Sequence, residues 1–193
     1  MSQNGWVETL ISAQIDGTAL TNTVTATSIL PPAARFTLPA NFFSYIGKSM
    51  RVRAFGRIST VVTTPGNLTL DVRLGTVASP IVAFNGGASA LNIVAQTNAT
   101  WDFEAILTAR SIGNGVLATL MGAAKWTSRA SLNAPAVGTT TGVGIVLLPD
   151  TAPVVGTGFD STVTNVVDMF ATFSIANAAN SIQVHGYTLE SLN

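Results

Sequence analysis

The sequence predicts an all-β protein, an antiparallel β-sandwich of jelly-roll-like type with about 8–10 strands. Three observations predict this fold. Apolar and polar residues alternate in the most regular segments, which is the period of a half-buried strand. Turns rich in Gly, Pro and Asn separate these short segments, and no segment has the pattern of an amphipathic helix. We therefore expect an eight-stranded jelly roll with extra strands.

The 193 residues are enough for one domain with a sizeable core. We place that domain at residues 35–193 and treat residues 1–34 as an N-terminal segment, an arm that contacts neighbouring subunits. Thr18–Ile29 is expected to form one or two short strands, because Thr and Val suit a pleated surface. Pro31-Pro32 ends this segment, since proline has no N–H for a sheet ladder.

Residues 47–75 hold the clearest pattern of the chain. Two alternating arms flank Pro65 and Gly66, which favour a chain reversal, so the sequence predicts a β-hairpin. Each arm has one apolar face and one polar, largely cationic face, as expected for a sheet covered on one side only. The cationic residues are Arg51, Arg53, Arg57 and Arg73.

An aromatic cluster precedes this hairpin. Residues 36–43 (FTLPANFF) predict a short strand interrupted by Pro39. We expect Phe42, Phe43 and Tyr45 to be buried beneath the sheet.

Thr100–Ile112 is the second well-patterned segment. Its aromatic positions, which include Trp101, predict a face toward the core, so Asp102 and Glu104 point outward. If this strand lies beside the hairpin, the two carboxylates face arginines across the ladder, and each pair contributes about 0.2–1 kcal/mol.

Further strands are predicted from short apolar or alternating runs. Residues 130–141 are expected to form a loop or an edge strand, and residues 150–160 a loop. The remaining predicted strands are Ile81–Phe84, Leu91–Ala95, Val116–Thr127, Gly142–Leu148, Thr162–Ile175 and Ile182–Leu192.

The composition is apolar and poor in charge. The chain is 47% hydrophobic and only 9% charged, with a mean hydropathy of +0.44, yet it has no apolar run of about 18 residues that would span a membrane. All nine basic residues lie between positions 35 and 129 with only three acidic residues, so this middle carries a net charge of +6. The ends carry the other six acidic residues. The ends either pack over the middle of the same subunit or attract the middle of a neighbouring copy.

The N-terminus has no basic leader and contains Glu8 and Asp16, so we expect no signal peptide and synthesis in a host cytoplasm. The absence of cysteine excludes disulfides, thiolate metal sites and cysteine nucleophiles.

The residues give no recognisable active site. Gly47-Lys48-Ser49 resembles the end of a phosphate-binding loop, but Phe42 stands where that motif requires glycine. His185 is the single histidine, and no serine occupies a G-x-S-x-G turn. We therefore expect a protein that is not an enzyme and that has no cofactor and no metal.

Two other interpretations of the charged residues stay open. Arg51, Arg53, Arg57 and Arg73, with Phe55 between them for stacking, have the elements of a nucleic-acid surface. The net charge of zero and the nearby acids favour a salt-bridged sheet face or a subunit contact instead, so we expect no nucleic-acid partner. Asp102 and Glu104 share a strand face and would be the carboxylates of an enzyme acting on cell-wall sugars.

Residues 38–113 carry a resemblance to a known group. The order LPANFFSYIGKSMRVRAFGRIST, NLTLDVRLG and WDFEAILTARSIG resembles small all-β virion proteins of tailed bacteriophages and prophages, and the C-terminal Leu189–Leu192 does so more weakly. The resemblance implies a jelly-roll-like subunit, usually oligomeric, mounted on a capsid or tail without a cofactor. Its motifs are strand patterns and not catalytic signatures.

Two function hypotheses follow. The first is a capsid decoration or cement protein that stabilises the head of a virion as a homo-oligomer, a trimer, in contact with the major capsid protein or other virion proteins and with no membrane. Its contact face would comprise Arg51, Arg53, Arg57, Arg73, Asp102 and Glu104. The alternative is a binding module of a tail or fibre that recognises a host-surface glycan through Trp6, Trp126 or Tyr187.

Overall fold

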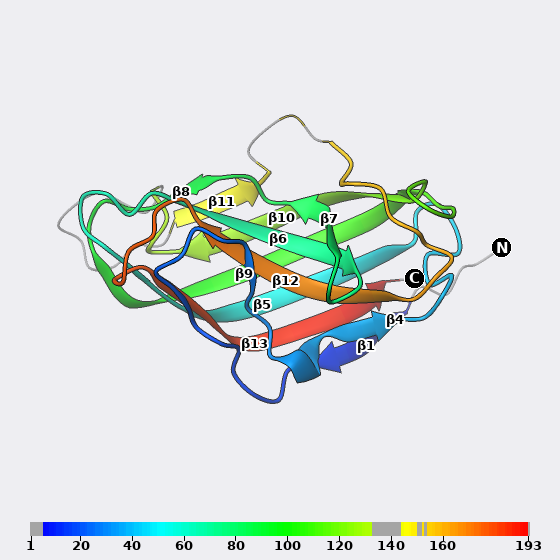
Figure 1. The fold of residues 1–193 in the computed structure, drawn as a ribbon, viewed down its shortest axis with the longest axis horizontal. Coiled ribbons are helices and arrows are strands. Elements are labelled where there is room, and N and C mark those ends of the chain that lie inside the picture. Colours follow the sequence, from blue (N-terminus) through cyan, green and yellow to red (C-terminus); the bar gives the residue numbers. More distant parts are fainter. Residues whose placement is uncertain (1–5, 133–143, 150–151, 153, 193) are drawn as a thin grey trace.

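The computed structural model describes residues 6–132, 144–149, 152 and 154–192. Two antiparallel sheets pack face to face (Figure 1), which confirms the predicted all-β sandwich. The larger sheet has the order β1 (Val7–Ser12), β13 (Ser181–Leu192), β5 (Ser49–Thr60), β9 (Gln96–Ser111), β10 (Thr119–Ser128) and β11 (Gly144–Leu148), with β2 (Leu20–Thr21) on β13. The smaller sheet has the order β3 (Thr27–Ser28), β12 (Asn165–Phe173), β6 (Asn67–Gly75) and β7 (Pro80–Asn85), with β4 (Phe36–Leu38) on β12 and β8 (Ser89–Ala90) on β6. We call them the seven-stranded and the six-stranded sheet.

The core lies between the sheets and follows the predicted alternation. Every second residue of β9 is buried from Ala99 to Ala109, and β12 buries alternate residues from Val167 to Phe173. Because successive strand side chains point to opposite faces, the intervening residues of β9 form part of the outer face of the seven-stranded sheet.

The predicted hairpin over residues 47–75 is wrong. β5 pairs with β13 and β9, whereas β6 pairs with β12 and β7 in the other sheet. The apolar faces of β5 and β6 therefore meet across the core, and the segment between them crosses from one sheet to the other. Asn180 holds this crossing: its Oδ1 accepts the N–H of Val61 at 2.9 Å, and its Nδ2 donates to the carbonyl of Pro65 at 3.0 Å.

Two smaller predictions also need correction. Leu91–Ala95 is not a strand; Leu91 makes one bridge to Ser131, and β9 begins only at Gln96. Phe43 is buried, with its ring 5.7 Å from the ring of Phe159, but Tyr45 is 47% exposed. Tyr45 lies in the irregular segment before β5, where it does not share the alternation that would direct it to the core.

The N-terminal segment forms part of the sandwich. β1 and β2 pair with β13, β3 pairs with β12, and Ile29 and Leu30 are buried in the core. Most of the predicted loop or edge strand at 130–141 lies outside the described residues.

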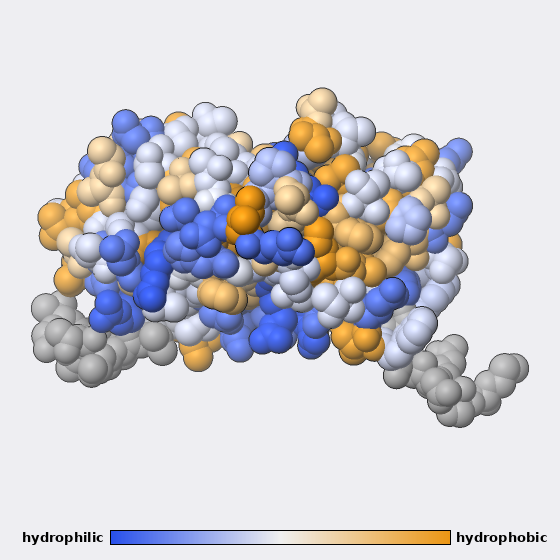
Figure 2. Space-filling view, turned by 90° about the horizontal axis from the view of Figure 1, so that it is seen from below, coloured by the Kyte–Doolittle hydropathy of each residue, from blue (hydrophilic) through white to orange (hydrophobic). Residues whose placement is uncertain are grey.

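The surface mixes polar and apolar side chains. On the side from which Figure 2 is seen, hydrophobic residues form several separate groups among hydrophilic ones. In the described part of the chain, no helix has the length and apolar character needed to cross a membrane.

Candidate functional site

The outer face of the seven-stranded sheet is built as rows that run across the strands. The strand register forms one such row from five residues, each paired with the next on the adjacent strand: Gly186 of β13, Phe55 of β5, Asp102 of β9, Thr127 of β10 and Ile145 of β11. We call these five residues the central row. Apart from Gly186, which has no side chain, the residues of this row point their side chains away from the core. Neighbouring strands are about 4.8 Å apart.

An exposed aromatic ring lies at one end of the central row. Phe55 is 54% exposed, an unusual degree for a phenylalanine. Its ring covers Gly186 so closely that a Cβ atom at Gly186 would lie 2.2 Å from Cε1 of Phe55. Because Gly186 has no side chain, the Phe55 ring can pack directly against the backbone of β13.

A bulge in β13 brings Gly186 to this position. The pairing with β5 shifts between Val184 and Gly186, so the intervening His185 has no partner residue in the register. Nδ1 of His185 instead lies 2.9 Å from Oδ2 of Asp16, which ties the bulge to the N-terminal segment. Without the extra residue, the glycine would not face Phe55.

Gly56, the residue after Phe55 on β5, makes a close contact on the core side of the sheet. A Cβ at Gly56 would lie 1.9 Å from the carbonyl oxygen of Gln183 and 3.1 Å from the indole of Trp101. Trp101 is fully buried, and its Nε1 donates to the same carbonyl at 3.2 Å. The backbone of β13 and the indole of Trp101 thus leave no room for a side chain at Gly56, directly after Phe55.

Ion pairs surround the central row. Nε of Arg51 lies 2.5 Å from Oε2 of Glu190, and Nε of Arg53 lies 3.3 Å from Oε2 of Glu104. The hydrogen bond to Glu190 raises the pKa of Arg51 above its ordinary value. Arg57 donates to the carbonyl of Asn98 at 3.2 Å. Arg51 and Arg53 are therefore paired with carboxylates within the sheet, whereas Arg57 keeps its positive charge.

Two polar groups of the central row keep their hydrogen-bonding capacity. Asp102 is exposed, and within the described residues neither its carboxylate nor the hydroxyl of Thr127 has a hydrogen bond or ion pair. A carboxylate accepts hydrogen bonds through two oxygens, and a hydroxyl both donates and accepts. These groups are available to a ligand.

A depression of about 260 Å³ lies beside Phe55. Its rim combines the ring with charged and hydroxyl groups, and the buried residues Ala54 and Tyr187 lie at its base. The residues of the rim are Arg53, Phe55, Asp102, Gly186, Thr188 and Glu190. An aromatic face next to hydrogen-bonding groups can hold a flat molecule that has an apolar face and a polar edge.

Of the six residues predicted for a salt-bridged or contact face, five lie on this outer face. Arg73 is the exception, because β6 belongs to the other sheet. There its Nη2 lies 3.0 Å from Oδ2 of Asp71, and its guanidinium lies 4.1 Å from the centre of the Phe170 ring. Nearby Asp168 pairs with Arg35 at 3.1 Å. Burial raises the pKa of both Asp71 and Asp168 above the ordinary value.

The three aromatic residues predicted for glycan contact differ in exposure. Trp126 is fully buried and Tyr187 is 3% exposed, so neither ring presents a face on which a sugar can stack, and that prediction is corrected. Both occupy inward positions of the strand alternation, where large aromatic residues fill the core. Burial also raises the pKa of the Tyr187 hydroxyl. Trp6 is 70% exposed, immediately before β1.

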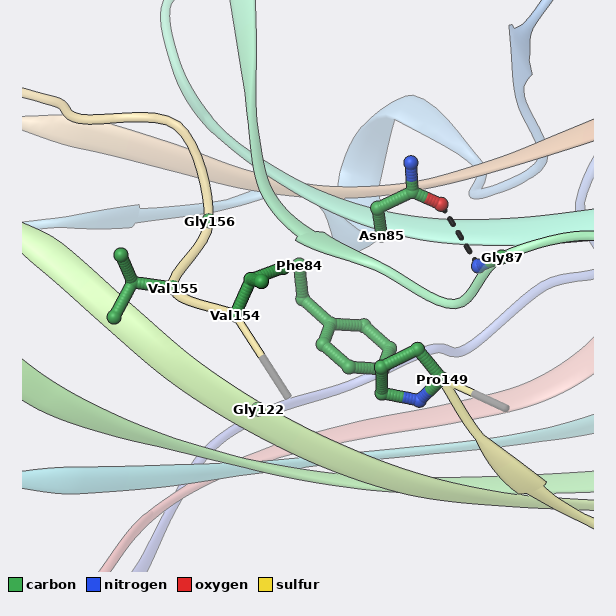
Figure 3. A pocket seen from close by; sticks show the side chains of 8 residues that line it. All are labelled: Phe84, Asn85, Gly87, Gly122, Pro149, Val154, Val155 and Gly156. Carbon is green, nitrogen blue, oxygen red and sulfur yellow. Dashed lines mark hydrogen bonds between the residues drawn. The ribbon is translucent and has the colours of Figure 1, made fainter. Parts of the chain in front are cut away.

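A second pocket, which we call the edge pocket, lies where β7 and β10 come together (Figure 3). The segment after residue 153 bridges the two sheets there: the N–H of Gly156 donates to Leu120 and the N–H of Thr157 donates to Val82. The pocket has a volume of about 250 Å³. Its lining residues are Phe84, Asn85, Gly87, Gly122, Pro149, Val154, Val155 and Gly156.

The edge pocket offers little chemistry. Asn85 supplies the polar side chain of its lining, and Oδ1 of Asn85 already accepts the N–H of Gly87 at 2.8 Å (Figure 3). The ring of Phe84 points into the space beside Pro149. No titratable residue is among the described residues that line this pocket, so it suits at most an apolar group.

The described residues contain no group placed for metal binding, and Asp102 and Glu104 lack the surroundings of a catalytic carboxylate pair. No group of three or more His, Asp or Glu side chains among the described residues is placed to hold a metal ion. Glu104 is paired with Arg53, and Asp102 lies on an open face. Neither carboxyl has the enclosed apolar surroundings in which a general acid stays protonated.

Sequence reasoning found only part of this site. The alternation predicts that Phe55 points outward, but the sequence pattern suggests stacking by this ring only on nucleic acid. Gly186 was missed, because no sequence signal shows which residue a bulge will bring opposite Phe55. An outward-facing phenylalanine in a charge-rich strand was the signal that could have identified the site.

No protein-family model and no curated protein matches the sequence. Among solved structures, the chain is similar to the CBM2 module of the evolved Dit of Lactobacillus casei BL23 phage J-1, with a TM-score of 0.34, 10% identity and coverage of 98% of this chain and 97% of that one. It is similar to lectin I-B4 from Griffonia simplicifolia in its metal-free form, with a TM-score of 0.33, 9% identity and coverage of 98% and 93%. Winged bean acidic lectin complexed with methyl-α-D-galactose gives a TM-score of 0.31, 10% identity and coverage of 98% and 100%.

Proposed function

We propose that this chain is a binding module without catalytic activity, which holds a neutral carbohydrate on the outer face of the seven-stranded sheet. The observation that carries the proposal is the exposed ring of Phe55, laid over Gly186 beside the unpartnered carboxylate of Asp102. A pyranose ring has an apolar C–H face, which stacks on an aromatic ring, and an edge of hydroxyls, which donate to a carboxylate.

The electrostatics of this face favour a neutral ligand. Arg51 and Arg53 are already paired with Glu190 and Glu104, so a bound anion would have to compete with these carboxylates. Asp102 and Arg57, which are the exposed charges next to Phe55 that no ion pair holds within the described residues, are opposite in sign. Lys125 adds one exposed cation in the neighbouring row. A hydroxyl-rich molecule can use both Asp102 and Arg57 without bringing a net charge of its own.

The sequence resemblance supports a place for such a module on a phage tail or fibre. Residues 38–113 resemble virion proteins of tailed phages, and in that setting a carbohydrate-binding surface serves to attach a tail or fibre to a host-surface glycan. The partner we propose is therefore a glycan of the bacterial surface, and the protein would be part of the virion.

The test is a glycan array with the purified chain and with Phe55→Ala. We expect the wild type to bind neutral glycans and Phe55→Ala to lose about 2- to 13-fold in affinity, since an aromatic contact contributes about 0.5–1.5 kcal/mol. Ile106→Ala is the matched control, because Ile106 is also apolar and exposed, at 43%, on the same face but outside the central row. Equal binding by wild type and Phe55→Ala would refute the proposed site.

A capsid decoration protein that clamps the head as a homotrimer is the second candidate. It is favoured by β11, the outermost strand of the seven-stranded sheet, which exposes Ile145 at 57% and Leu147 at 72%. Exposed apolar residues on an edge strand suit a contact with another subunit. Light scattering of the chain alone and with empty capsids tests this role: a monomer that does not bind capsids would eliminate it.

A further inference from the structure

We infer that the ligand is a chain of sugars that runs across the strands along the central row, from Phe55 over Asp102 and Thr127 to Ile145. This inference rests on the proposed function and specifies its substrate class: a neutral, β-1,4-linked oligosaccharide rather than a single sugar. The two ends of the row carry exposed apolar groups, and the two positions between them carry free polar groups.

The register fixes the length of this path. Phe55 pairs with Asp102, Asp102 with Thr127, and Thr127 with Ile145. Three strand spacings separate the two apolar ends, which is about 14 Å. A single pyranose ring on Phe55 reaches Asp102 but not Ile145, so only a longer chain can contact the whole row.

The groups of the row match the two kinds of surface that a sugar chain presents. Phe55 supplies a face for stacking, and the free groups of Asp102 and Thr127 can accept and donate hydrogen bonds to hydroxyls. Ile145, 57% exposed, gives an apolar surface for the face of a more distant ring. β-1,4-linked pyranoses form extended, flat chains, and such a shape can follow a sheet surface without a deep groove.

The neighbouring row does not offer an equivalent path. Register aligns Arg53, Glu104, Lys125 and Leu147 there, and Arg53 is already paired with Glu104. The same face thus provides a matched control, because Leu147 lies two residues from Ile145 on β11 and is even more exposed.

The test compares the binding of monosaccharides and hexamers by isothermal titration calorimetry. The probes are glucose with cellohexaose and N-acetylglucosamine with chitohexaose. We expect at least one hexamer to bind about tenfold or more tightly than its monosaccharide, and Thr127→Ala with Ile145→Ala to remove most of that gain. Leu147→Ala should keep it. Thermal unfolding of each variant verifies the fold.

The outcomes separate this inference from the proposed function. If Phe55→Ala weakens binding but the Thr127 and Ile145 variants keep the full hexamer gain, the site stands and the direction across the strands is wrong. Loss of the gain in Arg57→Ala would instead indicate a chain lying along β5. If neither hexamer binds while the array shows another glycan class bound at Phe55, the inferred substrate class is overturned. If Phe55→Ala has no effect on any ligand, the proposed function itself fails.

Discussion

Gly186→Ala gives the sharpest prediction for the Phe55 platform, because it should separate binding from stability. The new Cβ would lie 2.2 Å from Cε1 and 2.4 Å from Cζ of Phe55, so the ring must leave β13. These atoms are the far end of an exposed side chain, which can rotate into solvent. We therefore expect a change in unfolding free energy within about 0.5 kcal/mol but a loss of carbohydrate affinity close to that of Phe55→Ala.

Gly56→Ala is the matched control in the adjacent strand. Its Cβ would lie 1.9 Å from the backbone carbonyl oxygen of Gln183, which cannot move without breaking the ladder. We expect Gly56→Ala to lower the unfolding free energy by about 1–3 kcal/mol or more. Each kcal/mol lowers the melting temperature by about 2–4 °C. Differential scanning calorimetry and titration with the best array ligand measure both effects. A Gly186→Ala variant that binds normally would refute the role of the flat ring.

Three further predictions concern stability. Burial raises the pKa of Asp71 and Asp168, so the folded state binds their protons more tightly than the unfolded state; these two groups should add stability as the pH falls from neutral through the raised pKa toward the ordinary value of 3.8. Urea unfolding at a series of pH values should show a smaller gain for Asp168→Asn, and an equal gain would contradict this origin. Trp126→Ala should cost about 3–5 kcal/mol, whereas Trp6→Ala should change stability by less than about 0.5 kcal/mol; similar costs would contradict the assigned burial. A double-mutant cycle on Arg51 and Glu190 should give a coupling of about 0.2–1 kcal/mol, and no coupling at low salt would show that the pair is not formed in solution.

The strand alternation made much of the fold predictable. In β9 the exposed or half-buried positions, including Asp102 and Glu104, follow the sequence pattern closely, because a period of two is visible in sequence whenever one face is buried. The pairing of strands was not predictable in the same way. β5 and β6 are adjacent in sequence and each has one apolar face, and this pattern is the same whether the strands pair side by side or face each other across the core.

The candidate site was harder to predict, because it depends on contacts between residues that are distant in sequence. Phe55 and Gly186 are brought together by a bulge, and the bulge has no clear sequence signature. Trp126 and Tyr187 were predicted to contact a glycan, although the alternation in β10 places Trp126 inside. Tyr187 is out of step with Ile182 and Val184 in sequence, and it is the bulge at His185 that turns it inward.

The central claim is that the outer face around Phe55 is the carbohydrate-binding surface. The most direct measurement is an NMR titration of the ¹⁵N-labelled chain with the best ligand of the glycan array. We predict that the largest amide shifts occur at Phe55, Asp102 and Gly186, with smaller shifts toward Thr127. Shifts confined to the edge pocket around Phe84 and Val154, or no shifts at all, would contradict the claim.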